Sequence, residues 1–178
     1  MMRVLLALAA VLLVAAAPAP PAITSVMARA AARAGQWQSA ARLWRTQTLA
    51  EPTSGEAWAG LGQALLEAGE AGDAAIALER AGLLLPGDAG LWLPRGRAAL
   101  ALGDNAAARA AFAAYTMSRP SDARGWTGLG VALDLEGQRG EAQTAYGRAL
   151  AVDPLNRAAR HNLALSLALG APAAPVSP

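Results

Sequence analysis

The sequence predicts an all-α protein built from helical hairpins that stack into a superhelix, with about four repeats followed by one C-terminal helix. The first observation is composition: 54% of the 178 residues are hydrophobic, with alanine and leucine abundant, and only 4% are aromatic. This favours closely packed helices over a sheet rich in β-branched residues. The second is a period of 34 residues in three residue types, which is typical of repeat arrays.

The repeated residues mark the ends of helices in each unit. They form three series: Pro52, Pro86, Pro120 and Pro154; Gly35, Gly69, Gly103 and Gly137; and Ser54, Asp88, Asp122 and Asn156. Serine, aspartate and asparagine accept hydrogen bonds from the free N–H groups at a helix start, so they cap the first helix of each unit. The glycine ends that helix in a left-handed turn, and the proline ends the second helix. Each unit is therefore predicted to be a helical hairpin.

The period divides the chain into repeats. We expect a repeat domain over residues 23–170, with units at about 21–54, 55–88, 89–122 and 123–156 and a terminal helix at 157–170. Residues 171–178, which hold three prolines, are expected to be a disordered tail.

The sequence within the units resembles the tetratricopeptide repeat. WAGLGQAL at 58–65 and WTGLGVAL at 126–133 are similar to the W-x-x-L-G-x-x-Y signature, and WLPRGRAA at 92–99 is a looser copy. The A-x-x-x-F element of the second helix corresponds to Ala40 with Trp44, Ala74 with Leu78, Ala108 with Phe112, and Ala142 with Tyr146. The resemblance covers about residues 21–170, and it implies a right-handed superhelix whose first helices line a concave binding surface.

Three glycines lie in the middle of predicted first helices, at Gly62, Gly96 and Gly130. Each costs about 1 kcal/mol relative to alanine, so we expect the second helix to approach closely there and to present Ala74, Ala108 and Ala142. The space between hairpins is expected to be filled by Trp58, Trp92 and Trp126. Pro94 fits in the first turn of a helix that starts near Gly90, and bends the helix if it starts earlier.

The concave surface is the expected binding site for a protein or peptide partner. Its candidate residues are those of the first helices that avoid the packing positions: Glu56, Gln63, Glu67, Leu93, Arg97, Leu100, Arg124, Thr127, Val131, Asp134, His161 and Leu165. Mixed charges with leucines favour an extended peptide or a partner helix. For each of these residues, the alternative is an ordinary solvated surface position.

Catalysis, cofactors, metals and nucleic acid are not expected. There is one histidine, His161, and no cysteine, and the thirteen carboxylates are spread singly, so no acid–base pair, triad or metal cluster is evident. All fifteen basic residues are arginine and the net charge is only +2, without the basic run that nucleic-acid binders carry. We predict a non-enzymatic protein.

The amino terminus predicts export. Arg3 is followed by fourteen apolar residues, Val4 to Ala17, and then by the segment APAPPA at 17–22. Fourteen residues are short for a bilayer span and typical of a signal-peptide core. We expect residues 1–16 to be a signal peptide cut ahead of Ala17, or an uncleaved anchor, and 17–22 to be a Pro/Ala linker. The protein would then be periplasmic or envelope-associated, with a cytoplasmic location as the alternative, and it would touch a membrane only through an uncleaved N-terminal segment.

A narrower resemblance suggests a pathway. GLGVALDLEGQRGEAQTAYGRAL at 128–150 and NRAARHNLALSLALG at 156–170 resemble the repeat protein of tight-adherence (Flp-type) pilus assembly. The resemblance implies a scaffold that assists assembly of a surface or secretion apparatus, although proteins of that kind are typically lipoproteins and this chain has no cysteine to acylate. The alternatives are a periplasmic maturation chaperone for an unfolded client, as in cytochrome c assembly, and a cytosolic adaptor.

The stretch HNLALSLALG at 161–170 is predicted to be the terminal first-type helix. Leu163 and Leu167 occupy the positions of Leu129 and Leu133, so we expect both to pack inward. Leu165 and Leu169 lie on another face, about 200° around the helix. They form a candidate docking face, with self-association through the C-terminal helix as one possible use.

Overall fold

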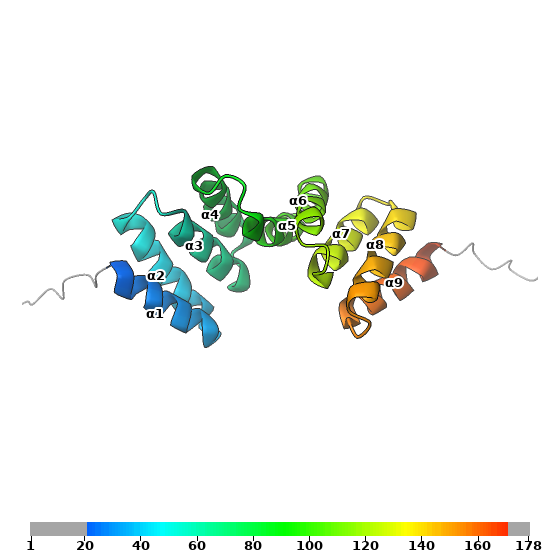
Figure 1. Cartoon of the computed structure of the whole chain (residues 1–178), viewed down its shortest axis with the longest axis horizontal. Coiled ribbons are helices and arrows are strands. Elements are labelled where there is room, and N and C mark those ends of the chain that lie inside the picture. Colours follow the sequence, from blue (N-terminus) through cyan, green and yellow to red (C-terminus); the bar gives the residue numbers. More distant parts are fainter. Residues whose placement is uncertain (1–20, 171–178) are drawn as a thin grey trace, which may run out of the picture.

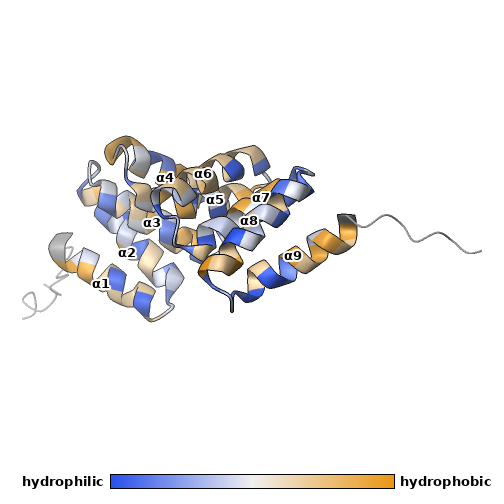
Figure 2. Cartoon of the chain, turned by 45° about the vertical axis from the view of Figure 1, so that its right-hand side comes forward, coloured by the Kyte–Doolittle hydropathy of each residue, from blue (hydrophilic) through white to orange (hydrophobic). Residues whose placement is uncertain are grey.

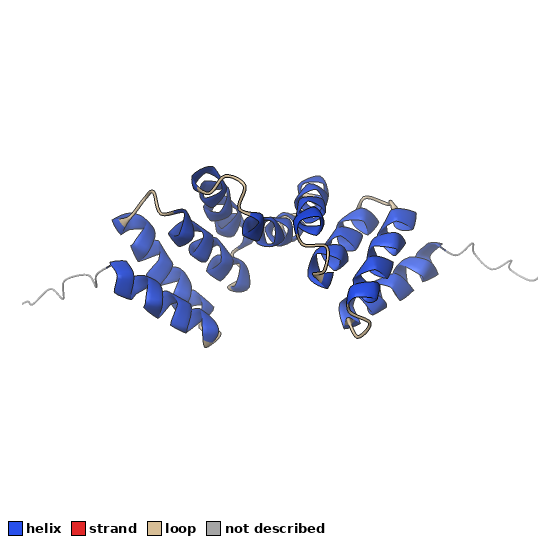
Figure 3. Cartoon of the chain, in the orientation of Figure 1, coloured by secondary structure: helices blue, strands red, loops and turns tan. Residues whose placement is uncertain are grey.

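A computed structural model describes residues 21–170, and over this range the chain forms nine α-helices and no strand (Figures 1 and 3). Consecutive helices pair as hairpins: α1 Pro21–Arg33 with α2 Trp37–Ala50, α3 Gly55–Glu67 with α4 Ala71–Leu84, α5 Trp92–Ala101 with α6 Asn105–Ser118, and α7 Ala123–Leu135 with α8 Arg139–Val152, followed by α9 Arg157–Gly170. The predicted fold class, four hairpins and a terminal helix, is confirmed.

Some expectations fall outside the described range. The segments 1–16 and 171–178, and most of the linker expected at 17–22, are not described. Helix α1 begins at Pro21, within that expected linker.

The helix ends follow the repeated residues. Ser54, Asp88, Asp122 and Asn156 each accept a hydrogen bond from a backbone N–H two or three residues ahead, which confirms the predicted caps. The turn after each of the first four first helices contains a glycine two residues past the helix end: Gly35, Gly69, Gly103 and Gly137, whose φ angles are +70°, +86°, +77° and +80°. These are left-handed values, which side chains disfavour, so the glycines are required by the turn.

The third hairpin starts differently from the others. A short 3₁₀ turn, η1 Ala89–Leu91, precedes α5, and Pro94 is the third residue of α5. Its missing N–H therefore falls in the first turn, where no intrahelical hydrogen bond is lost. The first of the two alternatives for Pro94 is confirmed.

The array curves with its first helices on the inside. Successive first helices touch one another, from α1 and α3 through to α7 and α9, whereas successive second helices make marginal contacts or none. The first helices α1, α3, α5, α7 and α9 therefore line the concave face.

One large side chain in each second helix locks two hairpins together. These residues are Trp44, Leu78, Phe112 and Tyr146, all at most 5% exposed. A Cβ placed on Gly62 would lie 2.6 Å from Leu78, and one on Gly96 would lie 2.8 Å from the Phe112 ring. The close approach expected at the mid-helix glycines is confirmed, but the nearest atoms belong to these large residues and not to the alanines four positions earlier. Those alanines, Ala74, Ala108 and Ala142, are fully buried beside them.

The same side chains also reach the next hairpin. Cβ atoms placed on Gly60 and Gly128 would overlap Trp44 and Phe112 of the preceding second helix. Phe112 is thus held between Gly96 of its own hairpin and Gly128 of the following one.

The tryptophans at 58, 92 and 126 are only partly buried. Trp58 packs against the cluster that joins α4 to α5, and Trp126 against the one that joins α7, α8 and α9. The indole N–H groups of Trp58 and Trp126 donate to the carbonyls of Pro52 and Pro120, at 2.9 and 2.8 Å. The tryptophans therefore cover the outer edge of the contact between two hairpins. The interior of that contact is filled by the large residues of the second helices.

The packing of Phe112 between two glycines gives a test of the fold. Replacing a mid-helix glycine by alanine ordinarily stabilises a protein by about 0.4–1 kcal/mol. Gly96→Ala should instead lower the free energy of unfolding by about 1–3 kcal/mol, because the Phe112 ring cannot move toward Gly128.

The matched control is Gly147→Ala in α8, where a Cβ would meet no atom within 4 Å. This variant should be as stable as the wild type or more so in urea unfolding. Equal behaviour of the two variants would contradict the packing described.

Candidate protein-binding groove

A pocket of about 330 Å³ opens on the concave face where α5, α6, α7 and the start of α9 meet, and we call it the α5–α7 pocket. It is lined by Leu93, Arg97, Leu100, Phe112, Arg124, Thr127, Gly128, Asn156 and Ala158. Five of these, Leu93, Arg97, Leu100, Arg124 and Thr127, are among the twelve predicted groove residues. The structure therefore brings five consecutive members of the predicted set of twelve into one pocket.

The floor of the pocket is apolar. Leu93 and Leu100 pack against the buried cluster that contains Phe112. Gly128 has no side chain to fill the space above the ring, since a Cβ there would overlap it. The glycine that admits Phe112 between two hairpins therefore also keeps this part of the groove open.

Two arginines form the polar rim, and both are held in place. The Arg97 guanidinium on α5 donates to the Glu67 carboxylate on α3 at 2.6 Å. Gln63 donates its amide N–H to the same carboxylate at 2.8 Å. Three predicted groove residues thus form one chain of contacts between neighbouring first helices, with the Arg97 side chain still 43% exposed.

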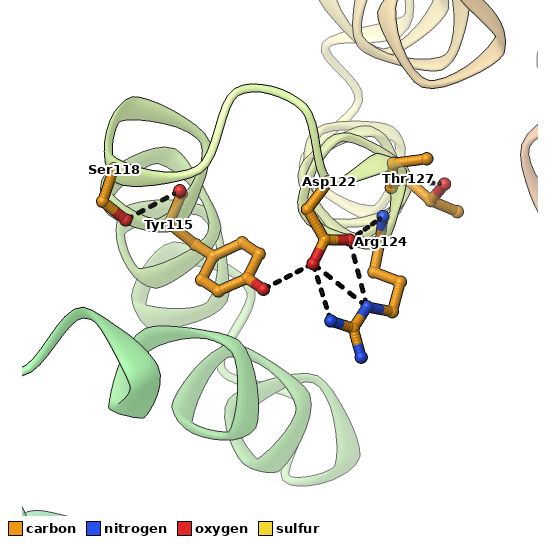
Figure 4. A network of polar contacts seen from close by, with 6 residues as sticks. Tyr115, Ser118, Asp122, Arg124 and Thr127 are labelled. Atoms are coloured by element: carbon orange, nitrogen blue, oxygen red, sulfur yellow. Dashed lines mark hydrogen bonds and ion pairs between the residues drawn. The ribbon is translucent and has the colours of Figure 1, made fainter. Parts of the chain in front are cut away.

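Arg124 is fixed by Asp122, the cap of α7 (Figure 4). The guanidinium donates through Nε at 3.0 Å and through Nη2 at 2.6 Å to the two carboxylate oxygens. Asp122 also accepts from the Arg124 backbone N–H at 3.0 Å and from the Tyr115 hydroxyl at 2.6 Å. One carboxylate therefore caps the helix, anchors α6 to α7 and orients an arginine at the pocket rim.

The pKa values in this network follow from the hydrogen bonds. The Arg124 side chain holds the pKa of Asp122 well below its usual range, helped by Tyr115 and opposed by burial. The hydrogen bond to Asp122 in turn raises the pKa of Arg124, and burial opposes this shift. Burial, and then the hydrogen bond to Asp122, raises the pKa of Tyr115. Asp122 and Arg124 are therefore ionised as a pair throughout the neutral range.

Thr127 offers the pocket mainly its methyl group, because its hydroxyl is already hydrogen-bonded. Its Oγ1 donates to the Ala123 carbonyl one turn back at 2.8 Å. Asn156 is similarly engaged, because its side-chain oxygen caps α9 by accepting from the Ala159 N–H at 3.0 Å.

Asp134, predicted to be a groove residue, instead holds neighbouring helices together. Its carboxylate accepts from the Tyr146 hydroxyl at 2.9 Å and from the Ser166 hydroxyl at 2.8 Å. Burial, and then the hydrogen bond to Asp134, raises the pKa of Tyr146. Ser166 is 1% exposed, so Asp134 ties α7 to both α8 and α9.

The remaining predicted residues lie apart from the pocket. Glu56 pairs with Arg29 of α1, near the other end of the array. Val131 is half-buried against the cluster around Leu133. His161 and Leu165 are exposed on α9.

Four pocket residues were missed in the sequence: Phe112, Gly128, Asn156 and Ala158. Phe112 was assigned to packing and Asn156 to capping, and the structure shows that they do this and line the pocket as well. Gly128 was noted only as part of the repeat signature at 126–133. Ala158 carries no signal in the sequence, since it depends on how α9 approaches α7.

The leucines of α9 differ in part from the expectation. Leu163 packs against the cluster around Tyr146, as predicted. Leu165 and Leu169 are 51% and 61% exposed, also as predicted. The prediction for Leu167 is wrong, because this side chain is 53% exposed. The corresponding Leu65 and Leu133 pack against their own second helices, α4 and α8, and α9 has no such helix among the described residues.

Residues 21–170 lack two other features: a membrane-spanning helix and a metal-binding cluster. No helix in this range is long and apolar enough to cross a membrane. The same range holds no cluster of three or more histidine, cysteine, aspartate or glutamate residues that could bind a metal ion.

Stacked hairpins with a concave face of first helices define a helical-repeat solenoid protein. The family model for the tetratricopeptide repeat matches residues 26–89 and 93–139. The chain belongs to the tetratricopeptide repeat family. Proteins of this fold are generally non-enzymatic scaffolds that bind a peptide or protein partner in a groove. Sequence comparison with curated proteins gives no match.

Solved structures share the fold. MamA from Desulfovibrio magneticus RS-1, residues 41 to the end, superposes with a TM-score of 0.77 at 21% identity, covering 84% of each chain. Another MamA crystal structure gives 0.74 at 21% identity, covering 83% of this chain and 81% of that one. YrrB, described as having an unusual peptide-binding site, gives 0.71 at 16% identity, covering 82% of this chain and 75% of that one.

The Asp122 network predicts a pH-dependent contribution to stability. Asp122→Ala removes a cap and leaves the Tyr115 hydroxyl without its acceptor, so it should lower the free energy of unfolding by about 2 kcal/mol at pH 7. The pKa of Asp122 is lower in the folded chain than the unfolded value of about 3.9. The stabilisation is therefore complete above that value and is lost as the pH falls through the folded pKa.

Urea unfolding of wild type and variant at about pH 7 and pH 3 measures this difference. Asp104→Ala, which removes the cap of α6 alone, serves as the control and should cost about 1 kcal/mol at pH 7. A cost of Asp122→Ala that does not shrink toward low pH would contradict the ionic network.

Proposed function

We propose that this protein is a scaffold that holds an extended peptide or a helix of a partner protein along its concave face. The α5–α7 pocket is the observation that carries the proposal. Its floor of Leu93, Leu100 and Phe112 accepts one large apolar side chain. The ion-paired Arg97 and Arg124 at the rim offer hydrogen bonds to the partner's carbonyls or carboxylates.

The rim arginines are suited to this role because they are already ordered. An arginine paired with a carboxylate of its own chain loses little side-chain freedom when a ligand arrives. Its guanidinium has five N–H donors, more than one carboxylate uses. The site therefore binds through preorganised donors around an apolar pocket, which is the common arrangement of specific peptide grooves.

The location we propose is the bacterial envelope. The support is the charged start at Arg3, the apolar run from Val4 to Ala17 and the proline-rich segment after it. The pathway we propose is assembly of a surface or secretion apparatus of the tight-adherence pilus type. Its support is the resemblance over residues 128–150 and 156–170, a stretch that includes Ala158 of the pocket.

The groove is tested by filling the pocket from its edge. Ala158 is exposed at the pocket and Ala151 is exposed on α8 outside it, so tryptophan at each position makes a matched pair. The tagged chain is used to capture partners from the native envelope, and these are identified by mass spectrometry. Ala158→Trp should lower recovery of the main partner about ten-fold or more, while Ala151→Trp should leave it unchanged.

Both variants should keep the unfolding temperature of the wild type, because neither alanine is buried. Undiminished capture by Ala158→Trp would rule out the pocket as the contact. The partners themselves separate the pathways, since pilus ATPase or secretin components support the proposal and haem-ligation proteins support a maturation chaperone.

Export is tested by the mass of the amino terminus. Protein recovered from the envelope should begin at Ala17 if the signal is cleaved, or retain Arg3 in a membrane fraction if it serves as an anchor. Removal of Val4 to Ala17 should leave the protein in the cytoplasm in either case. Intact protein with Met1 in a soluble cytoplasmic fraction would contradict export.

A further inference from the structure

The outer face of α9, the last helix that the structure describes, is apolar. Leu165, Leu167 and Leu169 are 51%, 53% and 61% exposed, and Figure 2 shows apolar residues along the C-terminal half of this helix. No second helix among the described residues covers this face, and an exposed apolar face of this kind is typical of an interaction surface.

Equivalent positions in other repeats show how this face is covered elsewhere in the chain. Leu167 lies 34 residues after Leu133 and 102 after Leu65, so the three occupy equivalent positions in the second, fourth and last units, while the third unit has Ala99 there. Leu65 is 1% exposed and Leu133 is 5% exposed, against 53% for Leu167. The two buried leucines lie on first helices paired with a second helix, α4 or α8. Leu167 is therefore exposed because, among residues 21–170, no second helix packs on this side of α9.

Ala164 occupies the position that receives the large side chain of the second helix. Its counterparts Gly62 and Gly130 lie directly against Leu78 and Tyr146. An alanine at this position is compatible with such a partner, since the counterpart in α1, Ala28, is 0% exposed in the same cluster as Trp44. The exposed Ala164 is thus an open packing position.

We propose that α9 accepts one amphipathic helix of a partner protein, which takes the place held by the second helix in every preceding hairpin. The internal repeats define its chemistry. It runs antiparallel to α9 and carries a small residue followed four positions later by a large apolar one, as Ala74 precedes Leu78 and Ala142 precedes Tyr146. The small residue allows close approach, and the large one packs over Ala164 beside Leu167.

The charge of α9 adds a second requirement. Arg157, Arg160 and His161 are exposed in its first half, and the helix contains no aspartate or glutamate. The carboxyl end of an antiparallel partner helix lies beside these residues, so that end carries carboxylates. A second copy of α9 supplies none and presents Ala164 and Ala168, two small residues, at the same spacing. The charge and the spacing both favour a different protein over a second copy.

This surface is distinct from the groove. The α5–α7 pocket uses Asn156 and Ala158 at the start of α9, whereas the acceptor face is formed by Ala164 and Leu167 near its end. The inference therefore does not rest on the proposed function of the groove.

The test uses the full chain and a helical peptide of residues 138–153, QRGEAQTAYGRALAVD, held helical by a side-chain staple. This peptide contains the required spacing at Ala142 and Tyr146 and ends in Asp153. Binding is measured by fluorescence anisotropy of the labelled peptide. The wild-type chain should bind it, and Leu167→Gln should weaken binding about ten-fold or more, equivalent to about 1.4 kcal/mol.

Two controls isolate the face. Leu155→Gln, at a leucine that is 79% exposed before α9 begins, should leave peptide binding unchanged. The peptide with Tyr146→Ala should bind about ten-fold more weakly to the wild-type chain. Circular dichroism of Leu167→Gln should match the wild type, because the replaced side chain is exposed.

Three results would overturn the proposal. One is failure of the stapled peptide to bind the wild-type chain, and another is equal binding to wild type and Leu167→Gln. The third is a concentration-dependent dimer of the chain that Leu167→Gln abolishes, since the face would then be covered by a second copy. Ala158→Trp should retain peptide binding, so that loss of groove function and loss of this site are told apart.

Discussion

The insertion of one large side chain from each second helix between two first helices is the contact on which the array depends. Phe112 shows it most completely, because its ring lies against Gly96 of its own hairpin and against Gly128 of the next. The same side chain closes the hairpin and joins it to its neighbour, so folding within a repeat and packing between repeats are energetically linked. The mid-helix glycines, which weaken an isolated helix, give Leu78, Phe112 and Tyr146 the space for this contact.

The groove is a consequence of that packing. Stacking of the hairpins brings successive first helices into contact, which lets Glu67 on α3 reach Arg97 on α5 of the next hairpin. At the third and fourth hairpins the same arrangement leaves an open space over Phe112, between Leu93, Leu100 and Gly128. Packing residues and pocket-lining residues are therefore not separate sets in this protein. The rim arginines acquire fixed positions because the carboxylates that hold them belong to helix caps and neighbouring helices.

Much of the architecture was predictable because it depends on local chemistry. Caps such as Ser54 and Asp122 and left-handed turns at Gly69 and Gly137 act over two or three residues, so their spacing alone defines hairpins. The lining of the candidate pocket was predictable only in part. Leu93, Arg97, Leu100, Arg124 and Thr127 meet as expected, but Asp134 is used to hold Tyr146 and Ser166. Periodicity places a residue on a face, and it does not reveal which side chain its oxygen will bind.

Leu167 is a second case in which periodicity alone does not predict the environment of a side chain. Its sequence position equals that of Leu133, yet one is exposed and the other buried, because burial depends on a second helix that α9 lacks among the described residues. The sequence by itself determined the all-α repeat, the positions of the hairpins and the family, since these follow from short-range capping, turns and periodic packing positions. Only the tertiary structure decided which predicted residues share a pocket, which are held by ion pairs and which leucines face solvent. Those outcomes depend on distances between side chains that lie about thirty residues apart in the chain and meet only when the hairpins stack.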